Sequence, residues 1–413
     1  MSDGERTIPL TESRDLRTGH VPWREADWVP PVSSKFPGGK VDVAILGGGI
    51  MGAVLADRLS EGGRSVAICD RRPPGTGSTA ASTAQLMWAM DVPLTTLAGR
   101  LGEAEAARRW LRVFAAMERF GQRLDHVEGA ARQDVPTLYL AGDLLDPQGL
   151  ERKAALHRRH GLPSEFLPAE AVAARFGITP KAGIVSGGTF SIDPVRTCHA
   201  LLSRACQRGA QLAYPVDIVA LHPTPDGITL EAADGRTVTA GDVVLATGYE
   251  RARLFLPPAF SLLSTYAIAT APGVAPLWKE QAMIWEASDP YLYVRAAGDG
   301  TIIAGGEDVE LSDAAARDHL LAGKAGAIAA KLARLLNRDK IDWDRSWTAT
   351  FGNSPDGLPA IGRAQSMEHV WIAAGFGGNG IAFAALAAEL LQAALDGVPD
   401  DDAQCFDPYR FEH

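Results

Sequence analysis

Cysteine is scarce in this chain, with four residues among 413. Cys69, Cys198, Cys206 and Cys405 form no C-x-x-C pair and have no accompanying histidine pattern. Their spacing predicts neither a disulfide framework nor a metal site, and it favours a reducing compartment, so we expect a cytoplasmic protein. Cys198 adjoins His199, but neighbouring side chains on a helix point in different directions, so we expect both to be structural.

Basic tracts and long apolar runs are also missing. The net charge is -10 and no Lys/Arg-rich segment offsets it, so nucleic acid is not an expected partner. The apolar stretch IAFAALAA near the end of the chain stops at Glu389 and is too short to span a bilayer. The polar start MSDGERTIPLTESRD does not resemble a signal peptide. With 46% apolar residues, the chain is long enough for two domains.

Glycine, in contrast, is concentrated at informative places. The stretch VDVAILGGGIMGAVLADRL, residues 41–59, is an apolar strand that turns through Gly47, Gly49 and Gly52 into a helical pattern. In this context G-x-G-x-x-G predicts a dinucleotide site, because the first two glycines permit the turn and close approach of a pyrophosphate. Gly52 lets the helix lie near the strand, and free N–H groups at the helix start face the anion. The alternative is an ordinary βαβ unit without a ligand.

The next predicted strand, RSVAICD, supports the nucleotide interpretation. It ends at Asp70, close to the spacing at which an acidic side chain bonds ribose hydroxyls. A carboxylate there repels a 2′-phosphate, so NADP is disfavoured despite Arg71 and Arg72. NAD and FAD both remain open on these residues alone.

Two further segments are candidates for the same site. Residues 77–86, GSTAASTAQL, are nearly all small, which permits close approach of a ring and offers several hydroxyls; the alternative is a solvated loop. The predicted strand in DVVLATGYE ends at Thr247 and Gly248, where a chain could pass close to a nucleotide.

The segment GFGGNGIAFAAL, residues 375–386, favours a flavin. Its glycines Gly375, Gly377, Gly378 and Gly380 directly precede a predicted helix. A helix N-terminus carries partial positive charge, which would stabilise the negative charge that develops at the N1–C2 edge of a reduced flavin. A nicotinamide enzyme has no evident use for this second helix start.

Seven segments taken in order resemble the D-amino acid oxidase/glycine oxidase (DAO) family of FAD enzymes, and within it the branch of γ-glutamylputrescine oxidase-like proteins. They are DVAILGGGIMG, GSTAASTAQL, ATGYE, PYLYVR…GDGTIIAGGED, FGNSPDGLPAIG, GFGGNGI and DPYRF, and the resemblance runs from about residue 36. It implies an α/β (α+β) fold, with a Rossmann-like FAD-binding domain and a discontinuous second domain built on an antiparallel sheet. The expected cofactor contacts are Gly47, Gly49, Ile50, Met51, Gly52, Asp70, Arg71, Ser78, Thr79, Ala81, Ser82, Thr83, Gln85, Val216, Thr247, Gly248, Gly377, Gly378, Asn379, Gly380 and Ile381.

The predicted domains are interleaved along the chain. After an N-terminal arm, the FAD-binding domain and the substrate domain alternate. The expected boundaries are 1–39 for the arm, 40–95, 178–250 and 345–413 for the FAD-binding domain, and 96–177 and 251–344 for the substrate domain.

The resemblance implies oxidation of a C–N bond in a small-molecule amine or amino acid. Hydride passes to flavin N5 and the imine is hydrolysed, with oxygen as the expected electron acceptor. The alternatives are a flavin dehydrogenase that reduces a quinone or carrier protein, an NAD-dependent dehydrogenase, and a non-catalytic FAD-binding protein.

Substrate contacts are expected from the strand YLYVR. Alternation places Tyr291, Tyr293 and Arg295 on one face. Arg295 could clamp a carboxylate through its planar fork; the alternative is a solvent-facing strand with Arg295 in a surface salt bridge. Tyr249 and Glu250, after the nucleotide strand, are secondary candidates for the cavity wall.

Three departures from the family pattern refine these expectations. Relatives that oxidise simple α-amino acids carry an arginine near the position of Phe351, where this chain has none, which favours a longer amine or an N-substituted amino acid. No cysteine lies near Ala349 and no histidine lies in residues 77–86, so we expect non-covalent FAD. The stretch TIIAGG lacks the lysine with which some oxidases assist oxygen, which favours an electron acceptor other than oxygen.

Overall fold

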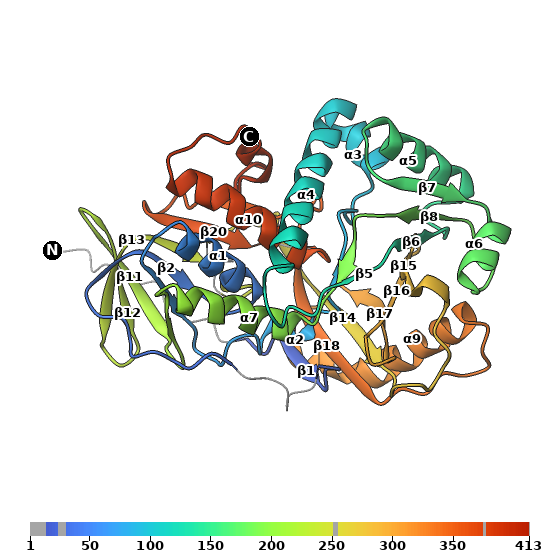
Figure 1. The fold of residues 1–413 in the computed structure, drawn as a ribbon, viewed down its shortest axis with the longest axis horizontal. Coiled ribbons are helices and arrows are strands. Elements are labelled where there is room, and N and C mark those ends of the chain that lie inside the picture. Colours follow the sequence, from blue (N-terminus) through green and yellow to red (C-terminus); the bar gives the residue numbers. More distant parts are fainter. Residues whose placement is uncertain (1–13, 24–29, 251–254, 375–376, 413) are drawn as a thin grey trace.

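The computed structural model describes residues 14–23, 30–250, 255–374 and 377–412. Two sheets with their covering helices lie side by side in Figure 1, and segments distant in the sequence alternate between them. The fold is a mixed α/β fold, as predicted.

The first sheet contains eight strands within the described residues. β2 lies between β3 and β13 in parallel, and β10 and β20 extend this parallel part. Because parallel strands are covered on both faces, the sequences of β2 and β3 are almost continuously apolar. The strand order is β10 (Gln211–Ala213), β3 (Val66–Cys69), β2 (Lys40–Leu46), β13 (Thr237–Leu245), β12 (Gly227–Ala232) and β11 (Ile218–Thr224), with β20 (Val370–Ala374) beside β13 and β19 (Ala360–Arg363) beside β20.

Three helices pack beside this eight-stranded sheet. α1 (Ile50–Glu61) contacts both α7 (Pro194–Gln207) and α10 (Gly380–Leu395). A Cβ added to Gly52 would overlap the carbonyl oxygen of Gly47, so only glycine lets α1 begin this close to the end of β2.

The second sheet contains nine described strands and is antiparallel except where β15 meets β6. α9 (Leu321–Leu335) packs on β14, β17 and β18, and α5 (Pro147–Arg159) packs on β7 and β8. The strand order is β1 (Arg17–Gly19), β18 (Arg345–Asn353), β14 (Ser261–Ala269), β17 (Ile302–Val309), β16 (Leu292–Ala296), β15 (Met283–Glu286), β6 (Thr137–Leu140), β8 (Gly183–Ser186) and β7 (Ser164–Leu167).

The remaining described elements are short apart from α4. A small sheet orders as β4 (Gln85–Leu86), β9 (Phe190–Ser191) and β5 (Gln133–Asp134). The other helices are α2 (Ser78–Ala81), α3 (Leu94–Leu101), α4 (Glu103–Leu124), α6 (Ala169–Phe176) and α8 (Ala314–His319), with 3₁₀ turns at Lys279–Gln281 and Ala403–Phe406.

Strand pairing differs from the expected domain boundaries at three places. β8 and β18 belong to the nine-stranded sheet, although the ranges 178–250 and 345–413 assign them to the FAD-binding domain. β1, from the expected arm, pairs with β18. Periodicity identifies a strand but not the sheet that it joins, so these partners were not readable from the sequence.

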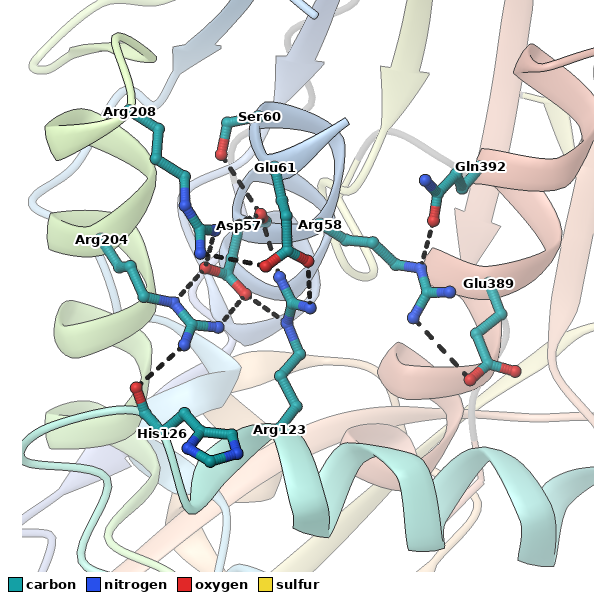
Figure 2. Close-up of polar contacts among 10 residues, drawn as sticks. All are labelled: Asp57, Arg58, Ser60, Glu61, Arg123, His126, Arg204, Arg208, Glu389 and Gln392. Carbon is teal, nitrogen blue, oxygen red and sulfur yellow. Dashed lines mark hydrogen bonds and ion pairs between the residues drawn. The ribbon is translucent and has the colours of Figure 1, made fainter. Parts of the chain in front are cut away.

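A network of ion pairs joins four helices of the two halves (Figure 2). Asp57 of α1 has no exposed surface and accepts hydrogen bonds from Arg123 of α4, from Arg204 of α7 and from Arg208, which directly follows α7. Glu389 of α10 is likewise buried.

Glu389 accepts from two arginines of α4. Arg112 Nη1 lies 2.7 Å from its Oε2 and Arg119 Nε lies 2.7 Å from its Oε1, while Arg58 of α1 approaches within 3.8 Å. Burial favours the protonated acid, but the hydrogen bonds from Arg119 and Arg112 outweigh it and lower the pKa of Glu389. We call Asp57, Glu389 and their arginines the arginine network.

Candidate active site

One continuous cavity runs between the two sheets. Its volume, including the open mouth, is about 1940 Å³. Every expected cofactor residue except Gly52 lines it, together with Tyr249, Glu250, Tyr291 and Tyr293. Gly375, which preceded this set in the glycine-rich segment, lies outside the described residues.

The glycine turn forms one end of the cavity. Gly47 has φ +117°, and a Cβ there would overlap the carbonyl oxygen of Ala246, so the turn requires glycine. The N-cap residue of α1 is Gly49, which has no side chain to satisfy the helix N–H groups. The Ile50 N–H donates to Thr79 Oγ1 over 2.9 Å, which attaches the small-residue segment to the start of α1. This helix start suits a pyrophosphate.

Asp70 is held beside the turn by backbone donors. Its Oδ2 accepts from the Gly48 N–H over 2.7 Å and its Oδ1 from the Arg72 N–H over 2.8 Å. Burial nevertheless raises the pKa of Asp70, although these two bonds oppose the shift. The carboxylate lies at the end of β3, where it could accept a ribose hydroxyl.

The two arginines after Asp70 are paired with a carboxylate. Arg71 and Arg72 both form ion pairs with the buried Glu250, and Arg72 Nη2 lies 2.8 Å from its Oε2. Glu250 therefore neutralises part of their charge, and the exclusion of a 2′-phosphate by Asp70 stays a prediction.

Cys198 and His199 support the turn from α7. The Cys198 thiol donates to the Gly48 carbonyl over 3.4 Å, and His199 Nε2 lies 2.8 Å from the Pro74 carbonyl oxygen. Both side chains are buried, so their contacts are structural. In the part of the chain that the structure describes, no group of three or more His, Cys, Asp or Glu side chains could hold a metal ion.

The middle of the cavity contains polar atoms without protein partners. Both amide atoms of Gln85 are buried and make no hydrogen bond, and the same holds for Thr265 Oγ1 and Trp285 Nε1. Buried polar groups are almost always hydrogen-bonded, so these atoms indicate a ligand with both donors and acceptors. The edge of an isoalloxazine ring offers both, and the residues present fit FAD.

The start of α10 holds a carboxylate that the sequence interpretation missed. Asp91 Oδ2 accepts from the Gly378 N–H over 2.8 Å, and Asn379 Nδ2 donates to the Ala89 carbonyl over 3.0 Å. A Cβ on Gly377 would overlap Asp91 Oδ2. Asp91 lines the cavity, and burial among protein atoms raises its pKa. No motif marks Asp91, because its partner lies almost 290 residues away.

Arg295 does not reach the cavity, which differs from the expected carboxylate clamp. It is buried, and its Nη1 donates to the carbonyl oxygens of Thr83, Ala84 and Ile192 over 3.0, 2.9 and 2.9 Å. Burial lowers its pKa to about 10. It is also not in the surface salt bridge that was the alternative. Its long side chain instead fixes the backbone of the small-residue segment, which strand alternation alone does not reveal.

Tyr291 and Tyr293 do line the cavity, with ring centroids 5.8 Å apart. The Tyr291 hydroxyl donates to Asp308 Oδ2 over 2.7 Å. Burial, followed by the Asp308 charge, raises the pKa of Tyr291 well above its ordinary value. Burial also raises the pKa of Asp308, although the nearby hydroxyls of Thr265 and Tyr291 oppose the shift. Asp308 was another residue that the sequence interpretation did not select.

These features define a class: a two-sheet oxidoreductase with one long dinucleotide cavity that ends at an aromatic wall. Comparison with known proteins identifies the family. The model described as "FAD dependent oxidoreductase" (DAO) matches residues 42–394, and the chain therefore belongs to the DAO family. Its cofactor is FAD, which sets aside the NAD-dependent alternative.

Individual relatives are distant. The chain is 26% identical over 355 residues to a glycine oxidase of Geobacillus kaustophilus, covering 83% of this chain and 89% of that protein. It is 26% identical over 260 residues to a mitochondrial dimethylglycine dehydrogenase of Mus musculus, covering 56% of this chain but 29% of that protein. The crystal structure of the Geobacillus kaustophilus glycine oxidase matches with a TM-score of 0.71 at 20% identity, covering 90% of this chain and 98% of that one.

The chain thus spans less than a third of the mouse dehydrogenase that it matches. In the described part of the chain, no helix has the length and apolar character needed to cross a membrane. The family match makes this chain an FAD-dependent oxidoreductase.

Proposed function

We propose that this enzyme oxidises the C–N bond of an amine or an amino acid at the aromatic end of the cavity and uses oxygen as electron acceptor. The observation that carries the proposal is the continuity of one cavity from the glycine turn to Tyr249, Tyr291 and Tyr293. A flavin held along it would present its ring to these side chains. Bound FAD supplies the two-electron acceptor for the reaction.

The residues contribute orientation rather than acid–base chemistry. Tyr291 is fixed by Asp308, and Tyr293 packs beside it, so a bound amine meets a rigid aromatic wall. Such positioning is the main task of a protein whose cofactor carries the redox step. Water then hydrolyses the imine that the oxidation forms.

We propose that the FAD is bound without a covalent link. Ala349 lines the cavity at the position where sarcosine-oxidising relatives are expected to carry a cysteine. Among the described lining residues there is no histidine, and Cys69 is the only cysteine. Cys69 lies at the nucleotide end, where burial raises its pKa to about 12 and makes it a poor nucleophile.

The second candidate function is a flavin dehydrogenase that transfers electrons to a quinone or carrier protein. It is favoured by one observation: no lysine is found among the described residues that line the cavity. Some oxidases use such a cation to assist oxygen.

Two measurements on the purified protein test these proposals. An absorption spectrum before and after heat denaturation should show a flavin that moves to the supernatant; colour retained in the pellet would mean a covalent link. Anaerobic addition of an amine panel should bleach the flavin, and air should restore it within seconds. Slow reoxidation would favour the dehydrogenase, and no bleaching by any amine or amino acid would contradict both candidates.

A further inference from the structure

At the aromatic end of the cavity, no cationic side chain is found among the described lining residues. Asp91 lines the cavity, and no ion pair to Asp91 is found among the described residues. Among the described lining residues, the cationic ones are Arg71 and Arg72, which lie at the nucleotide end and are both paired with Glu250. A substrate carboxylate would therefore meet repulsion near Asp91, whereas an ammonium group would be attracted.

Asp308 determines how the Tyr291 hydroxyl can bond a substrate. A tyrosine hydroxyl has one hydrogen to donate and lone pairs to accept with. The hydrogen of Tyr291 is committed to Asp308 Oδ2, so its oxygen can offer only lone pairs to the cavity. It is thereby an acceptor for an N–H group and not a donor to a carboxylate.

Asp308 also has a second carboxyl oxygen beside the one that holds Tyr291. This second oxygen, Oδ1, is buried and has no hydrogen-bond partner among the described residues. The neighbouring cations Lys324 and Lys331 form ion pairs with Glu307, and the charge of Lys324 also acts on Asp308. Asp91 and Tyr291, the hydrogen-bond partner of Asp308, line the same cavity.

We infer that the substrate is an amine that carries a second cationic group, as in a diamine or polyamine, and that it has no carboxylate near the reacting C–N bond. Asp91 binds the second ammonium group, and Tyr291, oriented by Asp308, accepts an N–H from the substrate. Asp308 is thus a positioning residue. This inference rests on the proposed amine oxidation and specifies its substrate class.

Three compounds of equal chain length test the inference in the FAD-loaded enzyme: 1,4-diaminobutane, butylamine and 4-aminobutanoate. Their far ends are cationic, neutral and anionic. We expect kcat/KM for the diamine to exceed that for butylamine at least about 10-fold, which corresponds to one well-placed charge interaction, and 4-aminobutanoate to be the poorest. The same order is expected for affinity in an anaerobic titration followed by the flavin spectrum.

The Asp91→Asn variant should lower the ratio of kcat/KM for the diamine to kcat/KM for butylamine about 10-fold. Asp226→Asn, in the exposed turn between β11 and β12, makes the same chemical change away from the cavity and should keep the ratio. If Asp91→Asn fails to fold, Tyr291→Phe serves instead: it keeps the ring, removes the lone pairs, and should weaken both amines more than 4-aminobutanoate.

Asp308 is tested by the change in selectivity that its role predicts. Asp308→Leu frees the Tyr291 hydroxyl to donate, so the relative kcat/KM for 4-aminobutanoate should rise. Asp308→Asn keeps an acceptor for that hydroxyl and should restore most of the preference for amines. If Asp308 had only a structural role, its substitution would lower kcat/KM for all three substrates together.

The outcomes separate this inference from the proposed function. If amines bleach the flavin but 4-aminobutanoate is preferred, or if Asp91→Asn leaves the ratio unchanged, the inference is overturned and amine oxidation stands. If nothing bleaches the flavin but the diamine binds most tightly and Asp91→Asn removes that preference, the cationic site stands and oxidation does not. If none of the three compounds bleaches or perturbs the flavin, the inference is overturned.

Discussion

Two groups of buried or enclosed carboxyl groups differ in their partners. In the arginine network, Asp57 is surrounded by three arginines (Figure 2), and Glu389 pairs with Arg112 and Arg119. At the aromatic end of the cavity, Asp91 and Asp308 are bonded by an N–H group and a hydroxyl, and no ion pair to either is found in the described chain.

The difference separates structural charge from functional charge. A carboxylate that is removed from water needs a partner, and arginine supplies it where helices must be held together. A carboxylate left without a cation raises the cost of folding and is retained where a ligand supplies the charge. Perturbed acids in a cavity are accordingly candidates for function.

Lys153 extends this comparison to a cation and gives the largest expected effect. It lies behind the cavity wall, 4.1 Å from the Tyr139 ring and 5.3 Å from the Trp285 ring, and its Nζ has no hydrogen-bond partner among the described residues. Burial lowers its pKa to about 7. We expect Lys153→Met to raise the free energy of unfolding at pH 7 by about 4 kcal/mol, because the unfolded chain alone gains protonation there.

The sign of this effect can be checked against pH. The folded pKa of Lys153 is depressed below its unfolded value, so between about pH 10 and pH 7 the unfolded state binds more protons and stability falls as pH falls. Denaturant unfolding of wild type and Lys153→Met at several pH values should show the two curves converge near pH 10. A variant that is less stable at pH 7 would contradict this explanation.

Asp57→Asn tests the structural role of the arginine network. It removes the anion from three arginines and is expected to cost about 3 kcal/mol in the free energy of unfolding, as is usual when a buried pair loses one partner. Glu61→Gln is the matched control, since Glu61 pairs with Arg123 and Arg208 at a half-exposed position. The control should cost less than about 1 kcal/mol. Equal losses would mean that burial does not decide the role of these acids.

Arg295→Met tests a cation that is buried without a carboxylate contact. It would leave the carbonyl groups of Thr83, Ala84 and Ile192 without their donor and loosen the small-residue segment. We expect the Kd for FAD to rise about 30-fold, equivalent to about 2 kcal/mol for an unsatisfied buried acceptor. Equilibrium dialysis against FAD measures this. If the affinity for FAD is unchanged and a substrate with a carboxylate binds more weakly, Arg295 binds that carboxylate, as the sequence predicted.

The smallest expected effect is a shift along the pH axis. The pKa of Asp91 is raised by burial, and Tyr139, Tyr249, Tyr291 and Asp308 face the same region. The diamine needs ionised Asp91, so its kcat/KM should fall as pH falls, with a midpoint above the ordinary pKa of aspartate, 3.8. In the Asp91→Asn variant, this fall of kcat/KM at low pH should be smaller by a factor of a few. A fall that is identical in both proteins would assign it to another group.

Much of the nucleotide half could be predicted because its signals are local. The glycine turn, Asp70 and the small-residue segment each lie within a few residues, and backbone geometry fixes what they can do. The unpredicted parts depend on distant contacts. Asp91 meets Gly378 and Arg295 meets Thr83 across the fold, and β8 joins the nine-stranded sheet by pairing with β6 and β7. Periodicity and spacing carry no information on such partners.

The most direct measurement is anaerobic titration of the FAD-loaded enzyme with 1,4-diaminobutane and with 4-aminobutanoate, followed by flavin absorbance. The uncompensated carboxylates predict that the diamine bleaches the flavin at a concentration at least about 10-fold lower than the amino acid does. Preferential bleaching by 4-aminobutanoate would contradict this, because it would require a cation where the structure places Asp91.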